Sequence, residues 1–288
     1  MLRAADVTFA YRGAARPVLR GVSLDLPADG FVGILGPNGS GKTTLLRVLS
    51  GTIRPSSGRV TLDGVDVTRI ARRQLARRMA VVPQETRLAF DFTVIEVVLM
   101  GRYPHLGQFE VEGPADAAIA RDALAATGTA DLADRQFTSL SGGEKQRVII
   151  AAALAQVAPP SGSDPTQFAS GSAARAGSDP RLLLLDEPTV ALDLAYQLEI
   201  AHLLQELQQR HQIGIAVSTH DLNFAAALCR YLVLLKDGQV LAAGATADVL
   251  TPDLINQLYG VRAEVTRHAG AGHLVVVPIA RDGGGARR

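Results

Sequence analysis

The amino-acid sequence predicts an α/β fold, and three patterns in it carry this prediction. The apolar run Phe31–Leu35 leads into the glycine-rich segment Gly36–Thr43, and a helical pattern follows, so a strand, a loop and a helix come in that order. The apolar runs Leu182–Leu185 and Ile213–Val217, joined by a helical segment, are typical of parallel strands buried on both faces. Segments up to Leu26 in which apolar and polar residues alternate predict a small antiparallel sheet as well.

The first third of the chain is predicted to be mainly strands. Asp6–Phe9 and Val22–Leu26 alternate apolar and polar residues, and a turn rich in Arg, Gly and Pro separates them. Arg59–Leu62 is predicted to be an edge strand of the same antiparallel sheet. Ala80–Pro83 is predicted to be a short buried strand that ends at Gln84.

The middle third is predicted to be helical. From Thr93 to about Val157, apolar residues recur with the spacing of a helix face. We therefore expect a helical subdomain over about residues 86–158. The helices predicted there are Val94–Met100, Ala115–Ala126 and Glu144–Val157.

Residues 159–180 differ in composition from the segments on either side. They are dense in Pro, Ser, Gly and Ala, and Phe168 is their one aromatic residue. Such a stretch buries too little apolar area to offset the entropy lost when a chain is ordered. We expect a flexible surface insertion, with a binding loop as the less favoured alternative.

The last third returns to alternating helices and strands. Beyond residue 262, short apolar segments around a glycine-rich turn predict a hairpin, and the residues from Asp282 onward are expected to fray. The predicted organisation is therefore one domain over residues 1–262, followed by a C-terminal hairpin and tail over 263–288. The helices predicted in this third are Ala195 to about Gln209 and Asn223–Arg230, and the strands are Tyr231–Leu235, Gln239–Leu241, Ala263–Thr266 and His273–Val277.

The composition excludes several classes of protein. The 288 residues are 47% hydrophobic, which suffices for a buried core and excludes a disordered or fibrous chain. A net charge of +1 gives no electrostatic reason for binding nucleic acid, so we expect no nucleic acid as a partner. Cys229 stands alone, which excludes an internal disulfide and a cysteine zinc cluster and fits a reducing cytosol.

The sequence also bears on membrane association. It begins without the apolar core of a signal peptide, and no uncharged run reaches the ~18 residues that a membrane span needs. We therefore expect the chain itself to be soluble, with any membrane contact made through a partner subunit.

The loop Gly36–Thr43 has the G-x4-G-K-T spacing of a phosphate-binding loop. Its glycines allow consecutive backbone N–H groups to point at phosphate oxygens, and the helix that begins near Lys42 adds its positive end. Lys42 supplies a point charge, and the Thr43 hydroxyl can be a Mg²⁺ ligand. A turn that binds nothing is the weaker alternative, because a strand precedes the loop and a helix follows it. The nucleotide contacts expected here are Gly36, Pro37, Asn38, Gly39, Ser40, Gly41, Lys42, Thr43 and Thr44.

Two acids, Asp186 and Glu187, follow the run Leu182–Leu185. Ligands of open α/β sheets bind at the carboxyl ends of the strands. Asp186 can hold Mg²⁺ directly or through water, and Glu187 can orient and deprotonate the water that attacks a γ-phosphate. The alternative, that both acids only cap the following turn, is disfavoured because the phosphate loop requires such a strand.

A second helix start suited to anions lies within Leu140–Arg147. Ser141, Gly142 and Gly143 form a turn that exposes backbone N–H groups, and Glu144 opens the helix. Taken alone, the segment is better explained as an ordinary N-cap with a favourable acid in the first turn.

Together these residues resemble the ATP-binding subunit of an ATP-binding cassette (ABC) transporter, from about Leu2 to Val261. The resemblance implies a P-loop NTPase of ABC type, with a RecA-like core, an antiparallel β subdomain and a helical subdomain. Gly36–Thr43 is similar to the family's Walker A loop, Leu182–Glu187 to its Walker B motif, and Leu140–Arg147 to its signature.

The resemblance also implies roles for residues that are unremarkable by themselves. Gln84 is similar to the family's Q-loop glutamine, Ala191–Asp193 to its D-loop and His220 to its switch histidine, while Tyr11 is expected to stack on adenine. Without the family, Tyr11 and His220 would be core residues and Gln84 an exposed glutamine. The implied catalytic residues are Glu187, His220 and Gln84, the further ATP contacts are Tyr11, Ser141, Gly142, Gly143, Glu144 and Asp193, and the implied Mg²⁺ ligands are Thr43, Gln84 and Asp186.

The family further implies partners and a location. The signature of one protomer closes on the γ-phosphate held by the Walker A loop of the other, so two ATP molecules hold a homodimer that hydrolysis releases. Transmembrane permease subunits are implied as direct partners and a substrate-binding protein as an indirect one. The implied location is peripheral, at the cytoplasmic face of the inner membrane.

Two further segments of the chain resemble one subgroup of the family. Phe90–Val98 and Gly101–His105 resemble the importers of iron(III)-siderophores, haem and cobalamin, although an ordinary helix start with a Pro turn is the alternative. Ala152 departs from the family, which usually has Arg there. We expect an ATPase that energises a metal-chelate importer; the alternatives are the ATPase of another ABC transporter class and a soluble ABC ATPase not coupled to transport.

Overall fold

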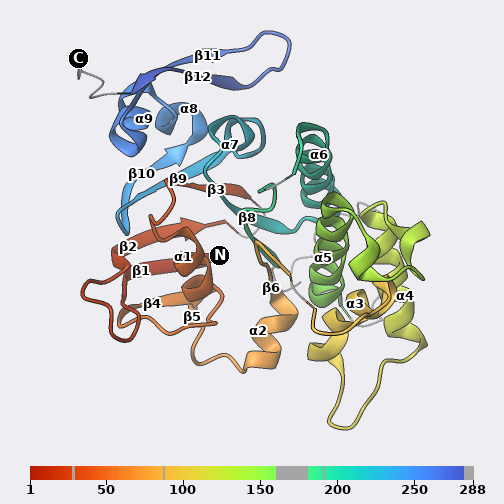
Figure 1. Ribbon diagram of the computed structural model, residues 1–288. Helices are drawn as coiled ribbons and strands as arrows, with labels where there is room; N and C mark the ends of the chain where they lie inside the picture. The colour runs from red at the N-terminus through yellow and green to blue at the C-terminus, as the bar shows by residue number, and fades with distance from the viewer. Residues whose placement is uncertain (28–29, 87, 160–180, 191, 282–288) are drawn as a thin grey trace. The chain divides into compact units, whose positions relative to one another are not determined.

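The computed structural model describes residues 1–27, 30–86, 88–159, 181–190 and 192–281. The chain forms two compact units (Figure 1). One consists of Met1–Thr68 with Ala216–Arg288, and the other of Arg69–Ile215. Both units combine helices and strands, so the predicted α/β class is confirmed. The N-terminal and C-terminal segments of the chain thus fold together, and the segment between them forms its own unit.

The first unit contains the predicted antiparallel sheet. β1 (Leu2–Phe9) pairs antiparallel with β2 (Leu19–Leu26) on one side and with β4 (Ser57–Leu62) on the other. The sequence predicted β4 as an edge strand, and this was wrong: the two-residue strand β5 (Val65–Asp66) pairs with its outer side. From Val22 to Leu26, alternate side chains of β2 are buried, as expected of a sheet with one face on the core.

A second sheet of the first unit carries the glycine-rich loop. Its strand order is β10 (Gln239–Ala245), β9 (Tyr231–Lys236), β3 (Phe31–Leu35) and β8 (Gly214–Thr219), of which β8 begins in the second unit. β3 and β9 are parallel, and all five residues of β3 are buried. A strand buried on both faces explains why Phe31–Leu35 is continuously apolar.

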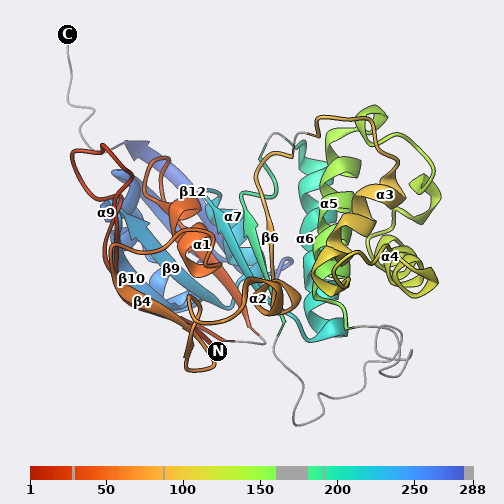
Figure 2. The same cartoon turned by 90° about the horizontal axis from the view of Figure 1, so that it is seen from below.

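Helices of the first unit pack against these sheets. α1 (Lys42–Leu49) contacts β1 (Figure 2), and α7 (Leu222–Leu228) follows β8. α7 ends before the predicted Arg230, because Cys229 is already in an extended conformation. α8 (Thr246–Val249) and α9 (Pro252–Tyr259) come after β10.

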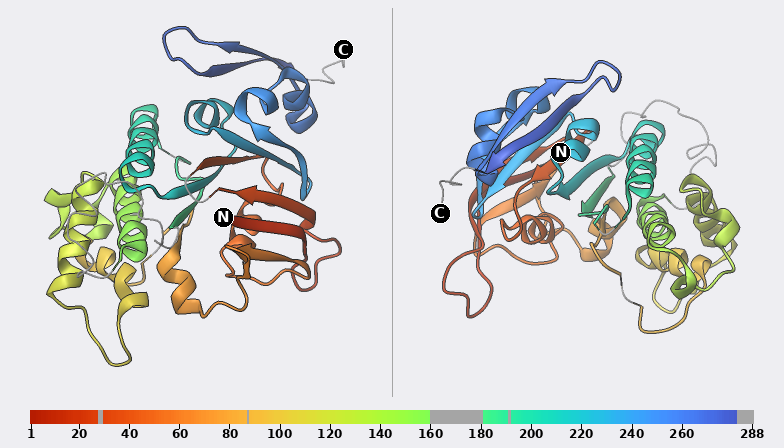
Figure 3. Two further views of the ribbon diagram at one scale, coloured as in Figure 1. Left: turned by 180° about the vertical axis from the view of Figure 1, so that it is seen from behind. Right: turned by 45° about the horizontal axis from the view of Figure 1, so that its top comes forward.

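The chain ends in a two-stranded hairpin. β11 (Val261–Arg267) and β12 (Leu274–Arg281) pair antiparallel along their whole length and form a long ribbon beside α9 (Figure 3). β11 packs on α9, and β12 packs on α7. Gly260, with φ +66°, ends α9 in the left-handed conformation that glycine favours and turns the chain directly into β11.

The second unit pairs two strands with a group of helices. β6 (Met79–Val82) lies parallel to β7 (Leu182–Asp186), and all five residues of β7 are buried. α2 (Arg72–Arg78), which leads into β6, was not predicted; Leu75 is its one buried residue, so it lacks an apolar stripe.

The remaining helices of the second unit surround α5 (Gly142–Val157). α3 (Val94–Leu99), α4 (Pro114–Ala126) and α6 (Leu194–His211) pack on it (Figure 2). The predicted helix Val94–Met100 ends at Leu99 and continues as the 3₁₀ helix η1 (Met100–His105). Short 3₁₀ turns, Ala130–Leu132 and Phe137–Ser139, precede α5.

Two expectations concern residues that the structure does not describe. Residues 160–180, nearly all of the predicted insertion, lie outside the described residues, and so do residues 282–288.

Candidate nucleotide site

The loop between β3 and α1 has the backbone that its glycines predict. Gly39 and Gly41 have φ angles of +80° and +104°, in the region that residues with a β-carbon avoid. Gly41 is the N-cap residue of α1, and no side chain caps this helix start. The start of α1 thus has no side-chain cap, and the positive end of the helix attracts an anion.

Two backbone carbonyl groups of the loop hold the side chain of Lys42. The side chain is 5% exposed, and its Nζ donates hydrogen bonds to the carbonyl oxygens of Gly36 at 2.8 Å and of Pro37 at 3.2 Å. The ammonium group is thus fixed beside the loop at the start of α1, so its charge adds to that of the helix end.

Two observations show that the loop fits a phosphate group. Ser40 is 3% exposed, and its Oγ has no hydrogen-bond partner among the described residues, which is costly for a buried hydroxyl. A β-carbon at Gly36 would lie 2.3 Å from the carbonyl oxygen of Leu235, so the strand behind the loop leaves no room for a side chain. The loop is thus closely supported from behind by the segment that contains Leu235.

Tyr11 lies beside the phosphate loop. Its hydroxyl is 3.2 Å from Oγ1 of Thr44, and its ring packs edge-on against Phe9, with centroids 4.9 Å apart. Although anchored at both points, the side chain is 41% exposed. An exposed aromatic ring next to the first turn of α1 is placed to stack on the base of a bound nucleotide.

His220 is the other predicted site residue of the first unit. It is exposed and lies between β8 and α7, and β8 neighbours β3 in the sheet. The strand that precedes the phosphate loop is therefore next to the strand that precedes His220.

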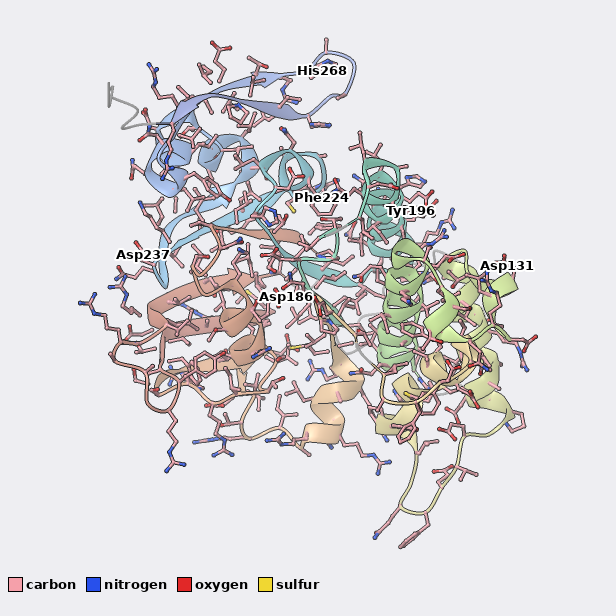
Figure 4. The ribbon with its side chains drawn as sticks, viewed as in Figure 1. Asp131, Asp186, Tyr196, Phe224, Asp237 and His268 are labelled. Carbon is pink, nitrogen blue, oxygen red and sulfur yellow. The ribbon has the colours of Figure 1, made fainter. Side chains whose placement is uncertain are left out.

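In the second unit, the predicted acids and Gln84 follow paired strands. The parallel register joins Val82 of β6 to Leu185 of β7, and Gln84 and Glu187 each come two residues later. The pairing thus delivers both side chains to the same edge of the two strands. Asp186, the last residue of β7, is 6% exposed and is labelled in Figure 4.

Glu187 has an unusual backbone conformation. Its φ of +46° is in the left-handed region, which costs a residue with a β-carbon roughly 1–2 kcal/mol. Such conformations persist where the surrounding structure holds them, and they cluster at functional sites. The strain at Glu187 supports its assignment to the site and argues against a turn that merely ends a strand.

The signature segment begins α5 with a capping box. The Ser141 Oγ accepts a hydrogen bond from the Glu144 N–H, and the Ser141 N–H donates to Glu144 Oε2 at 2.7 Å. Hydrogen bonding of the Glu144 carboxylate by the backbone and side chain of Ser141 is the main reason why the pKa of Glu144 is lowered, and Arg135 and Arg147 add to the effect. The geometry is that of an ordinary N-cap, the reading that the segment alone favoured, and it leaves Gly142 exposed at the helix start.

The start of α6 lies against the signature segment. Asp193 caps α6 by accepting a hydrogen bond from the Tyr196 N–H at 3.0 Å, whereas Ala191 lies outside the described residues. A β-carbon on Gly142 would be 3.5 Å from Leu192, and the side chains of Arg147 and Glu199 form an ion pair at 3.7 Å. Within the second unit, the predicted D-loop and signature residues are therefore neighbours.

The described residues contain no group of three or more His, Cys, Asp or Glu side chains that could enclose a metal ion. The donors predicted for Mg²⁺ are instead one hydroxyl, one amide and one carboxylate, from Thr43, Gln84 and Asp186. This set fits Mg²⁺, which is usually held by one or two carboxylates together with substrate phosphates and water.

Sequence reasoning missed two residues that support the site. Tyr196 packs on the signature segment, and Tyr259 donates a hydrogen bond to the backbone of His220. A tyrosine within a helical pattern gives no sign of such a contact, because the partner is far away in the sequence.

A strand, a phosphate-binding loop and an uncapped helix on an α/β fold define a P-loop protein that binds nucleoside triphosphates. The ABC transporter family model matches residues 19–159. The hemin import ATP-binding protein HmuV of Bordetella pertussis is 42% identical over 267 residues, which is 93% of this chain and 95% of that protein. The chain therefore belongs to the ABC family of ATP-binding proteins and is an ATPase.

Further comparisons agree with this family. The ferric enterobactin transport ATP-binding protein FepC of Escherichia coli is 35% identical over 280 residues, 97% of this chain and 94% of that protein. An inward-facing ABC transporter proposed to be of the metal-chelate type superposes with a TM-score of 0.77, at 28% identity, over 96% of both chains. A dimeric bacterial ABC cassette superposes with a TM-score of 0.68, at 28% identity, over 85% of this chain and 99% of that one. No helix among the described residues is long and apolar enough to span a membrane.

Proposed function

We propose that the chain is the ATP-hydrolysing subunit of an importer of metal chelates: iron-siderophores, haem or cobalamin. The main support is that relatives named for hemin import and ferric enterobactin transport match it over more than nine tenths of its length. The superposition on a transporter proposed to be of the metal-chelate type covers nearly the whole chain and points the same way.

Each predicted residue has a task in this proposal. The N–H groups of the loop and Lys42 bind the phosphates, and Tyr11 stacks on the adenine. Thr43, Gln84 and Asp186 hold Mg²⁺, which supplies positive charge to the phosphate oxygens. Glu187 orients the attacking water and accepts its proton, and His220 contacts the γ-phosphate.

The working assembly is a dimer that carries two ATP molecules. The Ser141–Glu144 segment of one protomer closes on the γ-phosphate bound by the other, and hydrolysis lets the protomers separate. The cycle is thus a switch between two conformations that permease subunits can use. We place the dimer on the permease at the cytoplasmic face of the cell membrane, with a substrate-binding protein delivering the chelate on the other side.

The carboxylate of Glu187 provides the sharpest test of the chemistry. Glu187→Gln preserves the shape of the side chain but removes the base, so ATP binding should remain while turnover falls by ~10²–10⁴. The matched control is Glu112→Gln, outside the site in the same unit, which should hydrolyse ATP at the wild-type rate. Turnover by Glu187→Gln near the wild-type rate would contradict the assignment.

The substrate class needs a separate experiment. The chain, reconstituted with its permease and binding protein in liposomes, should hydrolyse ATP faster when haem, a ferric siderophore or cobalamin is supplied. The control is the same preparation with Glu187→Gln, which should show no stimulation. If none of the three chelates stimulates an otherwise active preparation, the importer class is wrong although the ATPase assignment stands.

A further inference from the structure

His220 lies in a tight turn whose following side is held by local hydrogen bonds. The Asp221 N–H donates to Oγ1 of Thr219 at 3.0 Å. Asp221 Oδ1 then caps α7 by accepting from the N–H groups of Asn223 at 2.9 Å and Phe224 at 3.0 Å. These bonds fix the start of α7, but none of them contacts the carbonyl group of His220.

That carbonyl group is held from a distant segment. The hydroxyl of Tyr259, the last residue of α9, donates a hydrogen bond to the His220 oxygen at 3.2 Å, across 39 positions of sequence. The oxygen belongs to the planar peptide that joins His220 to Asp221. A bond to it restricts rotation of this peptide about the ψ angle of His220, and therefore the direction of the imidazole relative to α7.

The C-terminal hairpin holds the same region at a second point. The Asn223 side chain accepts from the Val276 N–H at 2.8 Å and donates to the Val276 oxygen at 3.2 Å, so its amide pairs with β12 much as a neighbouring strand would. Val276 is 2% exposed, which protects both bonds from water. Figure 4 labels Phe224 on α7 and His268 at the turn of the hairpin.

We propose that Tyr259 is a positioning residue for His220, and that the segment formed by α9 and the β11–β12 hairpin thereby sets the rate of ATP hydrolysis. This inference rests on the proposed function, in which His220 contacts the γ-phosphate. Tyr259 contacts the backbone of His220 and is not among the predicted nucleotide contacts, so it should affect turnover and leave nucleotide binding unchanged.

The first test removes one hydroxyl from the full-length chain. Tyr259→Phe should lower kcat roughly fivefold, the effect expected from losing one ordinary hydrogen bond, with KM for ATP unchanged. The matched control is Tyr231→Phe at the start of β9, whose hydroxyl makes no hydrogen bond within the described residues. An unchanged kcat in Tyr259→Phe would overturn the proposal.

The second test observes His220 directly. The ¹H–¹³C NMR signal of its ring, assigned by its loss in His220→Gln, should shift in Tyr259→Phe and stay in place in Tyr231→Phe. A purely structural effect of Tyr259 would lower the stability without moving this signal. A fall in kcat with an unmoved His220 signal would therefore also overturn the proposal.

A third experiment distinguishes a failure of this inference from a failure of the proposed function on which it rests. Tyr259→Phe combined with His220→Ala should hydrolyse ATP at the residual rate of His220→Ala alone, because the hydroxyl then has no imidazole to orient. A further fall in the double variant would contradict positioning through His220. Full activity of the single variant His220→Ala would instead contradict the role of His220 itself.

Discussion

Gly143 of the signature segment lies directly beneath the ring of Tyr196 from α6. A β-carbon at Gly143 would be 2.3 Å from Cδ1 and 2.7 Å from Cγ of that ring, closer than real β-carbons come to another atom. Tyr196, labelled in Figure 4, belongs to the first turn of α6, and the two ring atoms are those near the root of its side chain. The packing of Tyr196 within one protomer is thus a sufficient reason for a glycine at position 143, independent of any contact with a bound phosphate.

The first prediction follows from this contact. Gly143→Ala should lower the free energy of unfolding by roughly 1–3 kcal/mol, the usual cost of overpacking a dense interior. Urea unfolding of the purified chain measures it. The control is Gly142→Ala, where the new methyl group would meet Leu192 at an ordinary 3.5 Å and stability should change little. Equal stability of the two variants would contradict the packing argument.

The second prediction concerns the buried guanidinium of Arg102. Its side chain is 0% exposed; Nε donates to Asp116 Oδ1 at 3.0 Å, and Nη1 donates to the carbonyl oxygens of Ala155 and Ala158 at the end of α5. Asp116→Asn leaves this buried charge without its counter-charge and should cost about 3 kcal/mol of stability. The control is Asp122→Asn, on the exposed side of the same helix.

The same pair predicts how stability depends on pH. Burial raises the pKa of Asp116, but the hydrogen bonds from Arg102 and Gly113 outweigh it, so the pKa lies below its usual value. A lowered folded pKa means that the stabilisation is complete above the unfolded value of about 3.9 and is lost as the pH falls through the folded value. Wild-type stability should therefore fall below about pH 4, and Asp116→Asn should lose less there. The same dependence of the free energy of unfolding on pH in the wild type and in Asp116→Asn would refute this.

The third prediction concerns His211, at the end of α6. Burial, with help from Arg181 and Arg210, lowers its pKa from 6.5 to about 4. Between these values the unfolded chain binds a proton that the folded chain does not, so stability should fall as the pH drops from 6.5 towards 4, by about 2–3 kcal/mol. His211→Gln should flatten this slope, whatever its effect at neutral pH.

The control for His211 lies on the same helix. The side chain of His202 is 75% exposed, so His202→Gln should keep the wild-type slope. The measurement is urea unfolding at several pH values between 4.5 and 7. A slope in His211→Gln equal to that of the wild type would show that another group titrates in this range.

The fourth prediction tests sites shared between protomers. Lys42→Ala should destroy nucleotide binding in its own protomer, and Ser141→Arg should block the γ-phosphate of the partner, so each homodimer should be inactive. In a mixed dimer the Walker A loop of the Ser141→Arg chain meets the intact signature of the Lys42→Ala chain. One complete site therefore survives, whereas sites built within single chains would leave none.

The measurement for mixed dimers is ATP trapped per purified heterodimer, with Glu187→Gln in both chains so that turnover is not required. Clear occupancy together with dimer closure supports the shared site. Occupancy no higher than in either parent homodimer, once heterodimer formation has been verified by differently tagged chains, would contradict it.

Much of the site could be predicted from the sequence because it depends on local backbone properties. The glycine spacing in Gly36–Thr43 predicted a curled loop, and Gly39 and Gly41 have the positive φ angles that such a loop requires. Continuous apolar runs predicted the buried strands that deliver Asp186 and support the loop. In each case a few consecutive residues determine the conformation, so no distant partner is needed.

Other features could not be predicted because their partners are distant in the sequence. Thr44 is 33 positions from the Tyr11 that it contacts, and Tyr259 is 39 positions from His220. Arg102 would have been expected on the surface, yet it is fully buried because α5 ends beside it and offers two carbonyl oxygens. The strained conformation of Glu187 has no signature in the sequence either.

The sequence by itself thus determined most of the strands and helices and the phosphate-binding turns, since these follow from the spacing of apolar residues and glycines. Helix α2, which has no apolar stripe, is an exception. Only the tertiary structure decided which side chains support these segments. A hydrogen bond such as that from Tyr259 to His220, or a contact such as that of Tyr196 with Gly143, depends on how elements far apart in the chain pack together. Packing is a property of the whole fold, and no local pattern records it.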